Sequence, residues 1–265
     1  METVKTKRKP LIITLVILLC LAVLIALFVF IYNKQALSRA LADLDIEDEE
    51  SVIRVMKHGG DDEEILIMLA DSYIGAGCYS DASRLMLYTL QYISSDSDKA
   101  FDTLKESYKL SGASDYFISS LSPLFTLTDY TLSASYDGTS YGIGENGIYT
   151  EFLGGYAKAK IAPSRTAKLS ACPSGVYFID LADYKLKLLS RDGSEIKTVL
   201  DDKMLDFVDF ESYLYYIDIN GQPHGPNKIT LEEGTFASDM RVEDGEVLCT
   251  VFDADYNEIK TVQLS

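Results

Sequence analysis

The chain has 265 residues, with 24 Lys and Arg against 41 Asp and Glu, so its formal net charge is −17 at pH 7. Residues 1–10 carry a surplus of +3, which leaves −20 for residues 11–265. Nucleic-acid binding begins with Lys and Arg side chains that neutralise phosphates. Because no basic stripe follows residue 10, the composition excludes DNA and RNA as partners.

An uncharged apolar segment covers the 22 residues from 11 to 32. As a helix it would be about 33 Å long, which is enough to cross a bilayer. A cleaved signal peptide is the main alternative, with a small-residue site at Ala40-Leu41-Ala42, but the apolar core of a signal peptide usually has only about 7–15 residues. Lipidation at Cys20 is disfavoured because Leu19, which is not small, precedes it. We therefore predict a retained transmembrane helix.

The charges beside this segment predict its orientation, because basic residues next to a span stay in the cytoplasm. Four of them precede the span, whereas acidic residues between Asp43 and Glu50 follow Lys34 and Arg39 on the other side. We expect a cytoplasmic basic tail at 1–10, a plasma-membrane span at 11–32 and an extracytoplasmic remainder. A small-xxx-small pair, Ala22 and Ala26, would allow two spans to pack as a homodimer.

Residues 33–121 show the apolar spacing and punctuation of helices. We expect one helix to end at His58-Gly59-Gly60, the next to run from the acidic residues 61–64 to Gly77, and another to start at Ser80-Asp81. Two more are expected at 98–110 and 114–121. These patterns predict antiparallel helix pairs with short connections.

One of these pairs has a more specific pattern. The residues that carry it are Leu69, Ala70, Tyr73, Gly77, Tyr79 and Ala82, and a poorer copy follows 35 residues later with Leu104, Tyr108 and Gly112. The stretch resembles a tetratricopeptide (TPR) repeat, which implies a helical surface that binds peptides or proteins. A stalk or spacer is the alternative, since such arrays generally need three or more repeats.

Residues 124–265 change to short alternating runs separated by hairpin turns. The turn dipeptides are Asp137-Gly138, Asn146-Gly147, Asp192-Gly193, Asn220-Gly221 and Asp244-Gly245. The sequence repeats internally every 28 to 38 residues. One copy is Tyr177-Phe178-Ile179-Asp180, which continues to Asp192-Gly193, and another is Tyr215-Tyr216-Ile217-Asp218. It resembles the propeller-like repeats of bacterial surface proteins in the DUF5050 family.

The whole chain is therefore expected to be an α+β multidomain protein. Its parts would be the transmembrane helix, a TPR-like helical segment at 33–121 and an all-β meander or partial β-propeller at 124–265. About 140 residues suffice for only three or four small blades, so a twisted sandwich remains an alternative to a propeller.

Several motifs resemble catalytic, nucleotide-binding or metal-binding sequences, but each is better explained as a turn or loop. Residues 138–142 spell G-x-S-x-G and residues 142–147 spell G-x-G-x-x-G, but a strand rather than a helix is expected after them, so we interpret both as a turn between strands. The loop at Asp253 lacks the Gly and Glu of a calcium site. His58 and His224 lie at a helix end and in a loop. We predict no catalytic, metal or cofactor residues. Three cysteines follow the span, Cys78, Cys172 and Cys249, and the sequence leaves a disulfide among them open.

Aromatic surface is the remaining candidate for binding, because the chain has 18 Tyr and no Trp. An outward Tyr can bind a peptide or glycan by stacking and hydrogen bonding, although cross-strand packing is the common alternative. The candidate partner-binding residues are Tyr73, Tyr79, Tyr108, Tyr177, Tyr215 and Tyr216. We expect a non-catalytic, membrane-anchored interaction or scaffold protein of the bacterial cell envelope, with an envelope protein or peptide as partner. The alternatives are an envelope hydrolase that uses Asp and Glu, and a carbohydrate-binding surface module.

Overall fold

The computed structural model describes residues 8–121, 127–227 and 229–265. The chain divides into two compact units, Met1–Gly60 and Asp61–Ser265. Each unit is described below by itself.

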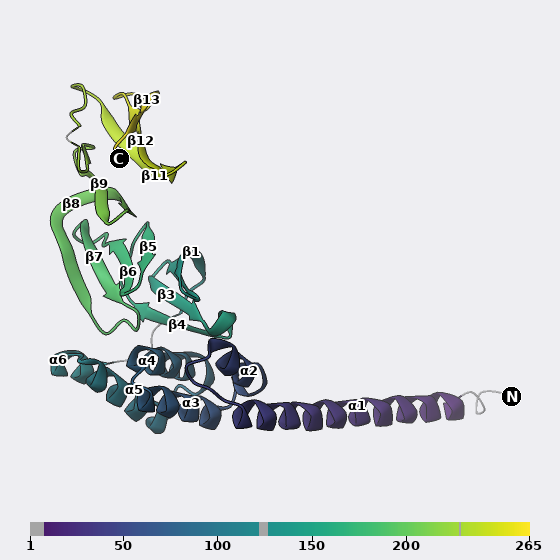
Figure 1. The fold of residues 1–265 in the computed structure, drawn as a ribbon. Helices are drawn as coiled ribbons and strands as arrows, with labels where there is room; N and C mark the ends of the chain where they lie inside the picture. Colours follow the sequence, from purple (N-terminus) through teal and green to yellow (C-terminus); the bar gives the residue numbers. More distant parts are fainter. Residues whose placement is uncertain (1–7, 122–126, 228) are drawn as a thin grey trace, which may run out of the picture. The chain divides into compact units, whose positions relative to one another are not determined.

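The first unit contains the apolar helix. Helix α1 runs from Arg8 to Ala42, and α2 from Glu49 to Gly59 (Figure 1). The 29-residue stretch Thr14–Ala42 is long and apolar enough to cross a membrane. The predicted apolar helix near the N-terminus is therefore confirmed, whereas most of the predicted tail at residues 1–10 lies outside the described residues. Helix α2 starts after Asp48, whose carboxylate accepts the backbone N–H of Glu50 as an N-cap.

The second unit begins with helices. They are α3 (Glu63–Gly75), α4 (Tyr79–Tyr88), the π-helical turn η1 (Thr89–Ile93), α5 (Asp98–Ser111) and α6 (Asp115–Ser119). Side-chain caps define most of their starts, because Asp62, Ser97 and Ser114 accept N–H groups of the first turns of α3, α5 and α6. Ala70 and Ala82 are buried in α3 and α4.

Three antiparallel sheets follow the helices. The first is four-stranded, in the order β1-β2-β3-β4, with β1 (Tyr130–Tyr136), β2 (Thr139–Gly144), β3 (Gly147–Phe152) and β4 (Ala157–Ala162). The second is six-stranded, in the order β10-β9-β8-β7-β6-β5, with β5 (Leu169–Cys172), β6 (Gly175–Ile179), β7 (Lys185–Ser190), β8 (Ile196–Phe210), β9 (Tyr213–Asp218) and β10 (Pro223–His224). The third contains β11 (Phe236–Glu243), β12 (Glu246–Phe252) and β13 (Glu258–Gln263). Strand β8 is long and curved, so the second sheet curls (Figure 1).

Aspartates cap three turns between strands in the same way. The Oδ1 atoms of Asp218 and Asp253 each accept the backbone N–H groups two and four residues further on, at 2.8 to 3.0 Å. Asp180 accepts the N–H two residues further on, at 2.9 Å. The aspartates that end the aromatic stretches 177–180 and 215–218 therefore close the turns after them, which is a structural role.

Helices of the second unit are tied to the sheets by buried and half-buried polar contacts. The Gln91 side chain in η1 exchanges two hydrogen bonds with the backbone of Lys160, donating to its C=O at 3.1 Å and accepting its N–H at 2.8 Å. Gln91 thus pairs with the edge strand β4 in place of another strand, which protects the edge. The buried Tyr108 hydroxyl in α5 donates to the C=O of Asp192 at 2.9 Å. These contacts make helices and sheets parts of one compact unit.

The α+β class predicted from the sequence is confirmed, with helices preceding an all-β region. The predicted change from helices to strands at residues 122–123 lies outside the described residues. No disulfide joins the cysteines in the described part of the chain, and Cys172 and Cys249 are buried. Burial raises the pKa of the Cys249 thiol to about 11.

Candidate functional site

Two glycines leave one face of strand β2 bare and make room for two tyrosine rings. Gly142 and Gly144 are two residues apart, so they lie on the same face of the strand. A Cβ atom at Gly142 would lie 2.7 Å from Cδ2 of Tyr130, and one at Gly144 would lie 2.6 Å from Cε2 of Tyr149. The rings of Tyr130 and Tyr149 therefore lie against a glycine floor and stack, with centroids 4.5 Å apart and planes 8° from parallel.

Hydrogen bonds hold both rings in place. The Tyr149 hydroxyl accepts the backbone N–H of Thr128 at 2.8 Å and donates to Oδ1 of Asn146 at 3.1 Å. The Tyr130 hydroxyl donates to Oε1 of Glu151. The Tyr130 hydroxyl is protonated at neutral pH, and burial and the Glu151 carboxylate raise its pKa further above its usual value of 10.0. The same hydrogen bond fixes the position of the Glu151 carboxylate.

Beside the Tyr130 ring lies a cleft of about 980 Å³, which we call the tyrosine cleft. Its lining residues are Tyr92, Leu127, Thr128, Asp129, Tyr130, Leu132, Glu145, Glu151 and Lys158. Glu151 and Lys158 are opposite each other on β3 and β4, and Lys158 Nζ lies 5.0 Å from the centroid of the Tyr92 ring. Aromatic faces, carboxylates and an ammonium group thus converge in one cleft, which suits a polar ligand with a stacking group.

The connection between β3 and β4 is strained. It is the short helix η2 (Leu153–Gly155), in which Leu153 has φ of 52° although it is not glycine, and Gly154 and Gly155 have φ of 62° and 85°. Such a conformation costs on the order of 1 kcal/mol, and strain of this kind is frequent beside functional sites. The turn joins the two strands that supply Glu151 and Lys158, so the strained segment adjoins the cleft.

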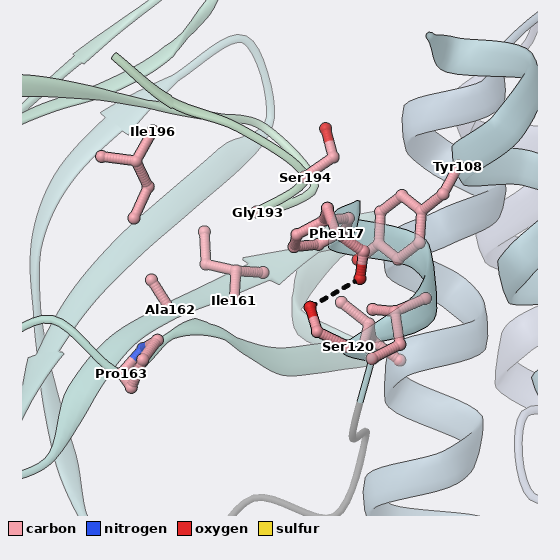
Figure 2. Close-up of a pocket in the computed structure, with 11 residues that line it drawn as sticks. Tyr108, Phe117, Ser120, Ile161, Ala162, Pro163, Gly193, Ser194 and Ile196 are labelled. Carbon is pink, nitrogen blue, oxygen red and sulfur yellow. Dashed lines mark hydrogen bonds between the residues drawn. The ribbon is translucent and has the colours of Figure 1, made fainter. Parts of the chain in front are cut away.

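A second, apolar pocket of about 390 Å³ lies between the helices and the sheets (Figure 2). Its lining residues are Leu87, Tyr108, Phe117, Ser120, Leu121, Ile161, Ala162, Pro163, Gly193, Ser194 and Ile196. Tyr108 meets Phe117 edge to face, with ring centroids 5.2 Å apart, and Ser120 Oγ donates to the C=O of Phe117 at 2.9 Å. Because its polar groups already have partners, this pocket suits an apolar side chain.

The six tyrosines predicted to bind a partner do not converge. Tyr73, Tyr108 and Tyr215 are buried, and Tyr108 lines the apolar pocket. The other three, Tyr79, Tyr177 and Tyr216, are half-buried. None of the six is among the described residues that line the tyrosine cleft.

Tyr216 instead lies in β9 of the second sheet, beside the turn that joins β9 to β10. Its ring stacks on His224 with centroids 4.4 Å apart, and its hydroxyl donates to Asp202 Oδ2 at 2.8 Å. His224 Nε2 lies 3.1 Å from Asp218 Oδ2, so the histidine completes the cap of this turn. Among the described residues no group of three His, Cys, Asp or Glu is placed to hold a metal ion.

Sequence reasoning missed the residues of the tyrosine cleft, although a signal was present. The stretch at 142–147 looks like a nucleotide-binding loop, but its first two glycines have the spacing of one strand face. A bare strand face between strands that carry Tyr130 and Tyr149 predicts aromatic rings laid over it. Tyr92, from a helical turn, has no comparable signal.

Comparison with known proteins gives no family for this chain. No protein-family model matches it, and no curated protein matches it. Among solved structures, a nidogen/laminin complex is 13% identical over 47% of this chain and 59% of the other chain, with a TM-score of 0.31. Citrobacter koseri AztD is 14% identical over 51% of this chain and 47% of the other chain, also with a TM-score of 0.31. The chain thus spans about half the length of each, and likenesses at this level carry no argument about function.

Proposed function

We propose that this protein is a single-pass, membrane-anchored interaction protein of the bacterial cell envelope, which acts without catalysis outside the membrane. In this proposal residues 11–32 of α1 stay in the membrane, with residues 1–10 in the cytoplasm. The TPR-like helices and propeller-like sheets form a scaffold, and a segment of another envelope protein binds in the tyrosine cleft.

The observation that carries the proposal is the built-in rigidity of the cleft. The Tyr130 ring that lines it stacks on the buried Tyr149 over the glycine floor, and the hydroxyl groups of both rings are hydrogen-bonded, so little entropy of the Tyr130 side chain would be lost when a ligand binds. Tyrosine rings and fixed polar groups are frequent in protein-binding sites, and a cleft of about 980 Å³ is large enough to hold several side chains of a peptide. The apolar pocket could hold an apolar side chain of the same partner.

Photo-crosslinking in intact cells tests the cleft. The crosslinker p-benzoylphenylalanine replaces Leu132, an exposed lining residue, and in a control it replaces Leu181, which is similarly exposed but outside the cleft. We expect the first position to capture one envelope protein, and Tyr130→Ala to abolish the adduct. Identical adducts from both positions, or none from the first, would contradict the proposal.

Fractionation tests the anchor. The full-length protein should stay with membranes in alkaline carbonate, and protease added outside spheroplasts should digest residues 33–265. A variant without residues 1–32 should be soluble. Recovery of a shorter mature chain that begins after Ala42 would instead identify α1 as a cleaved signal sequence.

Two other functions predict different results at the same cleft. A hydrolase would lose measurable turnover of peptide or cell-wall material when Glu151 is changed to Gln, while still capturing its substrate. A carbohydrate-binding module would bind envelope oligosaccharides and give no protein adduct from Leu132.

A further inference from the structure

We infer that the tyrosine cleft binds a cationic side chain of its partner, and that the guanidinium group of an arginine fits it best. This inference rests on the proposed function, since it assigns the chemistry of the partner segment that enters the cleft.

Charge is the first argument. The cleft lining contains three carboxylates, from Asp129, Glu145 and Glu151, and one ammonium group, from Lys158, so its formal charge is −2. The chain as a whole has a formal charge of −17. A positive group therefore gains attraction both on approach and inside the cleft, whereas a carboxylate or phosphate would meet three like charges.

The aromatic rings are the second argument. Lys158 Nζ already lies 5.0 Å from the centroid of the Tyr92 ring, so a cation rests on an aromatic face inside this cleft. Tyr130 packs one face on Tyr149 and is half-buried where it lines the cleft, so a ligand in the cleft can reach the exposed part of the ring. The face of a tyrosine ring is electron-rich and attracts a cation stacked on it.

The fixed position of Glu151 favours arginine over lysine. The Glu151 carboxylate accepts the Tyr130 hydroxyl, so it is held beside the ring on which a cation would stack. A planar guanidinium can stack on that ring and donate to the carboxylate at the same time, whereas an ammonium group is a point charge that cannot stack. The Tyr130 ring and the Glu151 carboxylate together thus suit a guanidinium group, which is flat and has several N–H donors.

Energy transfer gives a direct assay, because the chain contains 18 Tyr and no Trp. The probe is a pentapeptide, Trp-Gly-Arg-Gly-Gly, added to the full-length protein in lipid nanodiscs, with tyrosine excitation and tryptophan emission as the readout. Matched peptides replace Arg by Lys, by Glu or by citrulline, which has the shape of arginine without its charge. We expect the Arg peptide to bind at least tenfold more tightly than the citrulline peptide and more tightly than the Lys peptide, and to weaken as salt is raised.

Two variants locate the binding site. Glu151→Gln and Tyr130→Leu should each weaken the Arg peptide at least tenfold, whereas Glu243→Gln, which changes an exposed carboxylate in β11, should leave it unchanged. A circular dichroism spectrum equal to that of the wild type shows that each variant is folded. Equal affinity for the Arg and citrulline peptides, tighter binding of the Glu peptide, or an unchanged Glu151→Gln variant would overturn the inference.

Failure of the cationic inference can be distinguished from failure of the proposed function. If no basic peptide binds but crosslinking from Leu132 still captures a protein in a Tyr130-dependent way, the cationic inference is wrong and the proposed function stands. If both experiments fail, the proposed function is wrong as well. Binding of a chitin-type oligosaccharide in place of the Arg peptide would also refute the inference.

Discussion

Replacing Gly142 by Ala tests whether the stacked tyrosines depend on a bare strand face. The new Cβ atom would lie 2.7 Å from Tyr130 Cδ2 and 3.0 Å from the C=O of Thr131. Unstrained carbon atoms stay roughly 3.5–4.0 Å apart, so the ring must move by close to 1 Å. Overpacking of this kind costs about 1–3 kcal/mol, partly offset by about 0.5–1 kcal/mol because glycine is unfavourable within a strand.

The expected net loss for Gly142→Ala is about 1–2 kcal/mol in the free energy of unfolding, which corresponds to roughly 2–8 °C in Tm for a unit of this size. Removing the ring should relieve the clash. In a Tyr130→Ala background the same substitution should therefore be less costly, with a coupling free energy of about 0.5–2 kcal/mol. Contact with the Thr131 carbonyl remains, so the relief is partial.

Thermal and urea unfolding of the full-length protein in detergent, followed by circular dichroism, measure this effect. Gly75→Ala is the matched control, because no atom lies within 4 Å of a Cβ built at this helical glycine. The control should be neutral or more stable by up to about 1 kcal/mol. If Gly142→Ala unfolds at the wild-type temperature, or if the cycle with Tyr130→Ala gives no coupling, the glycine floor is not what positions the rings.

Three further predictions concern the contacts that hold the second unit together. Tyr108→Phe leaves the buried Asp192 carbonyl without its hydroxyl donor, so we expect urea unfolding to show a loss of about 1–3 kcal/mol in the free energy of unfolding. The control is Tyr116→Phe, at a side chain 83% exposed, which should change the free energy of unfolding by less than about 0.5 kcal/mol. Equal effects of the two substitutions would contradict the reasoning. Gln91→Leu removes both hydrogen bonds to the edge of β4, so hydrogen exchange of the β4 amides should become faster while that of β12 amides stays constant. Burial opposes ionisation of Asp218, but hydrogen bonds to its carboxylate outweigh burial and lower its pKa below the usual 3.8. The wild type should therefore lose stability as the pH falls below about 4. Asp218→Asn should be less stable at pH 7 and its stability should depend less on pH, and a pH profile identical to that of the wild type would refute this.

The sequence predicts helix ends well because their causes are local. Asp62, Ser97 and Ser114 each accept an N–H group only two or three residues away, so capping acts within a single turn of the chain. The predicted starts near 61, 98 and 114 accordingly agree with the helices to within about two residues. Turn dipeptides such as Asp137-Gly138 are local in the same sense.

The tyrosine cleft is not local, and this explains why it was missed. Tyr130 meets Gly142 and Gly144 only when β1 pairs with β2 in the observed register, which contains an irregularity between Leu132 and Ala134. A shift of one residue would turn the ring to the opposite face. Tyr92 lines the cleft from the helical turn η1. The residue before it, Gln91, is hydrogen-bonded to Lys160, which is 69 positions further along the chain. No single-sequence pattern predicts such a contact.

The six tyrosines that the sequence offers as partner-binding residues do not gather in one site, and three of them, Tyr73, Tyr108 and Tyr215, are buried. The Tyr73 and Tyr215 rings are buried, so they pack in the interior, whereas Tyr177, which matches Tyr215 in the internal repeat, is only half-buried. The repeated Asp, at 180 and 218, closes a turn. At Tyr73, Tyr215, Asp180 and Asp218 the side chains thus serve packing and turn closure. Binding groups belong to one place in the molecule, so they are better sought where a sequence departs from its repeat, as Gly142 and Gly144 do.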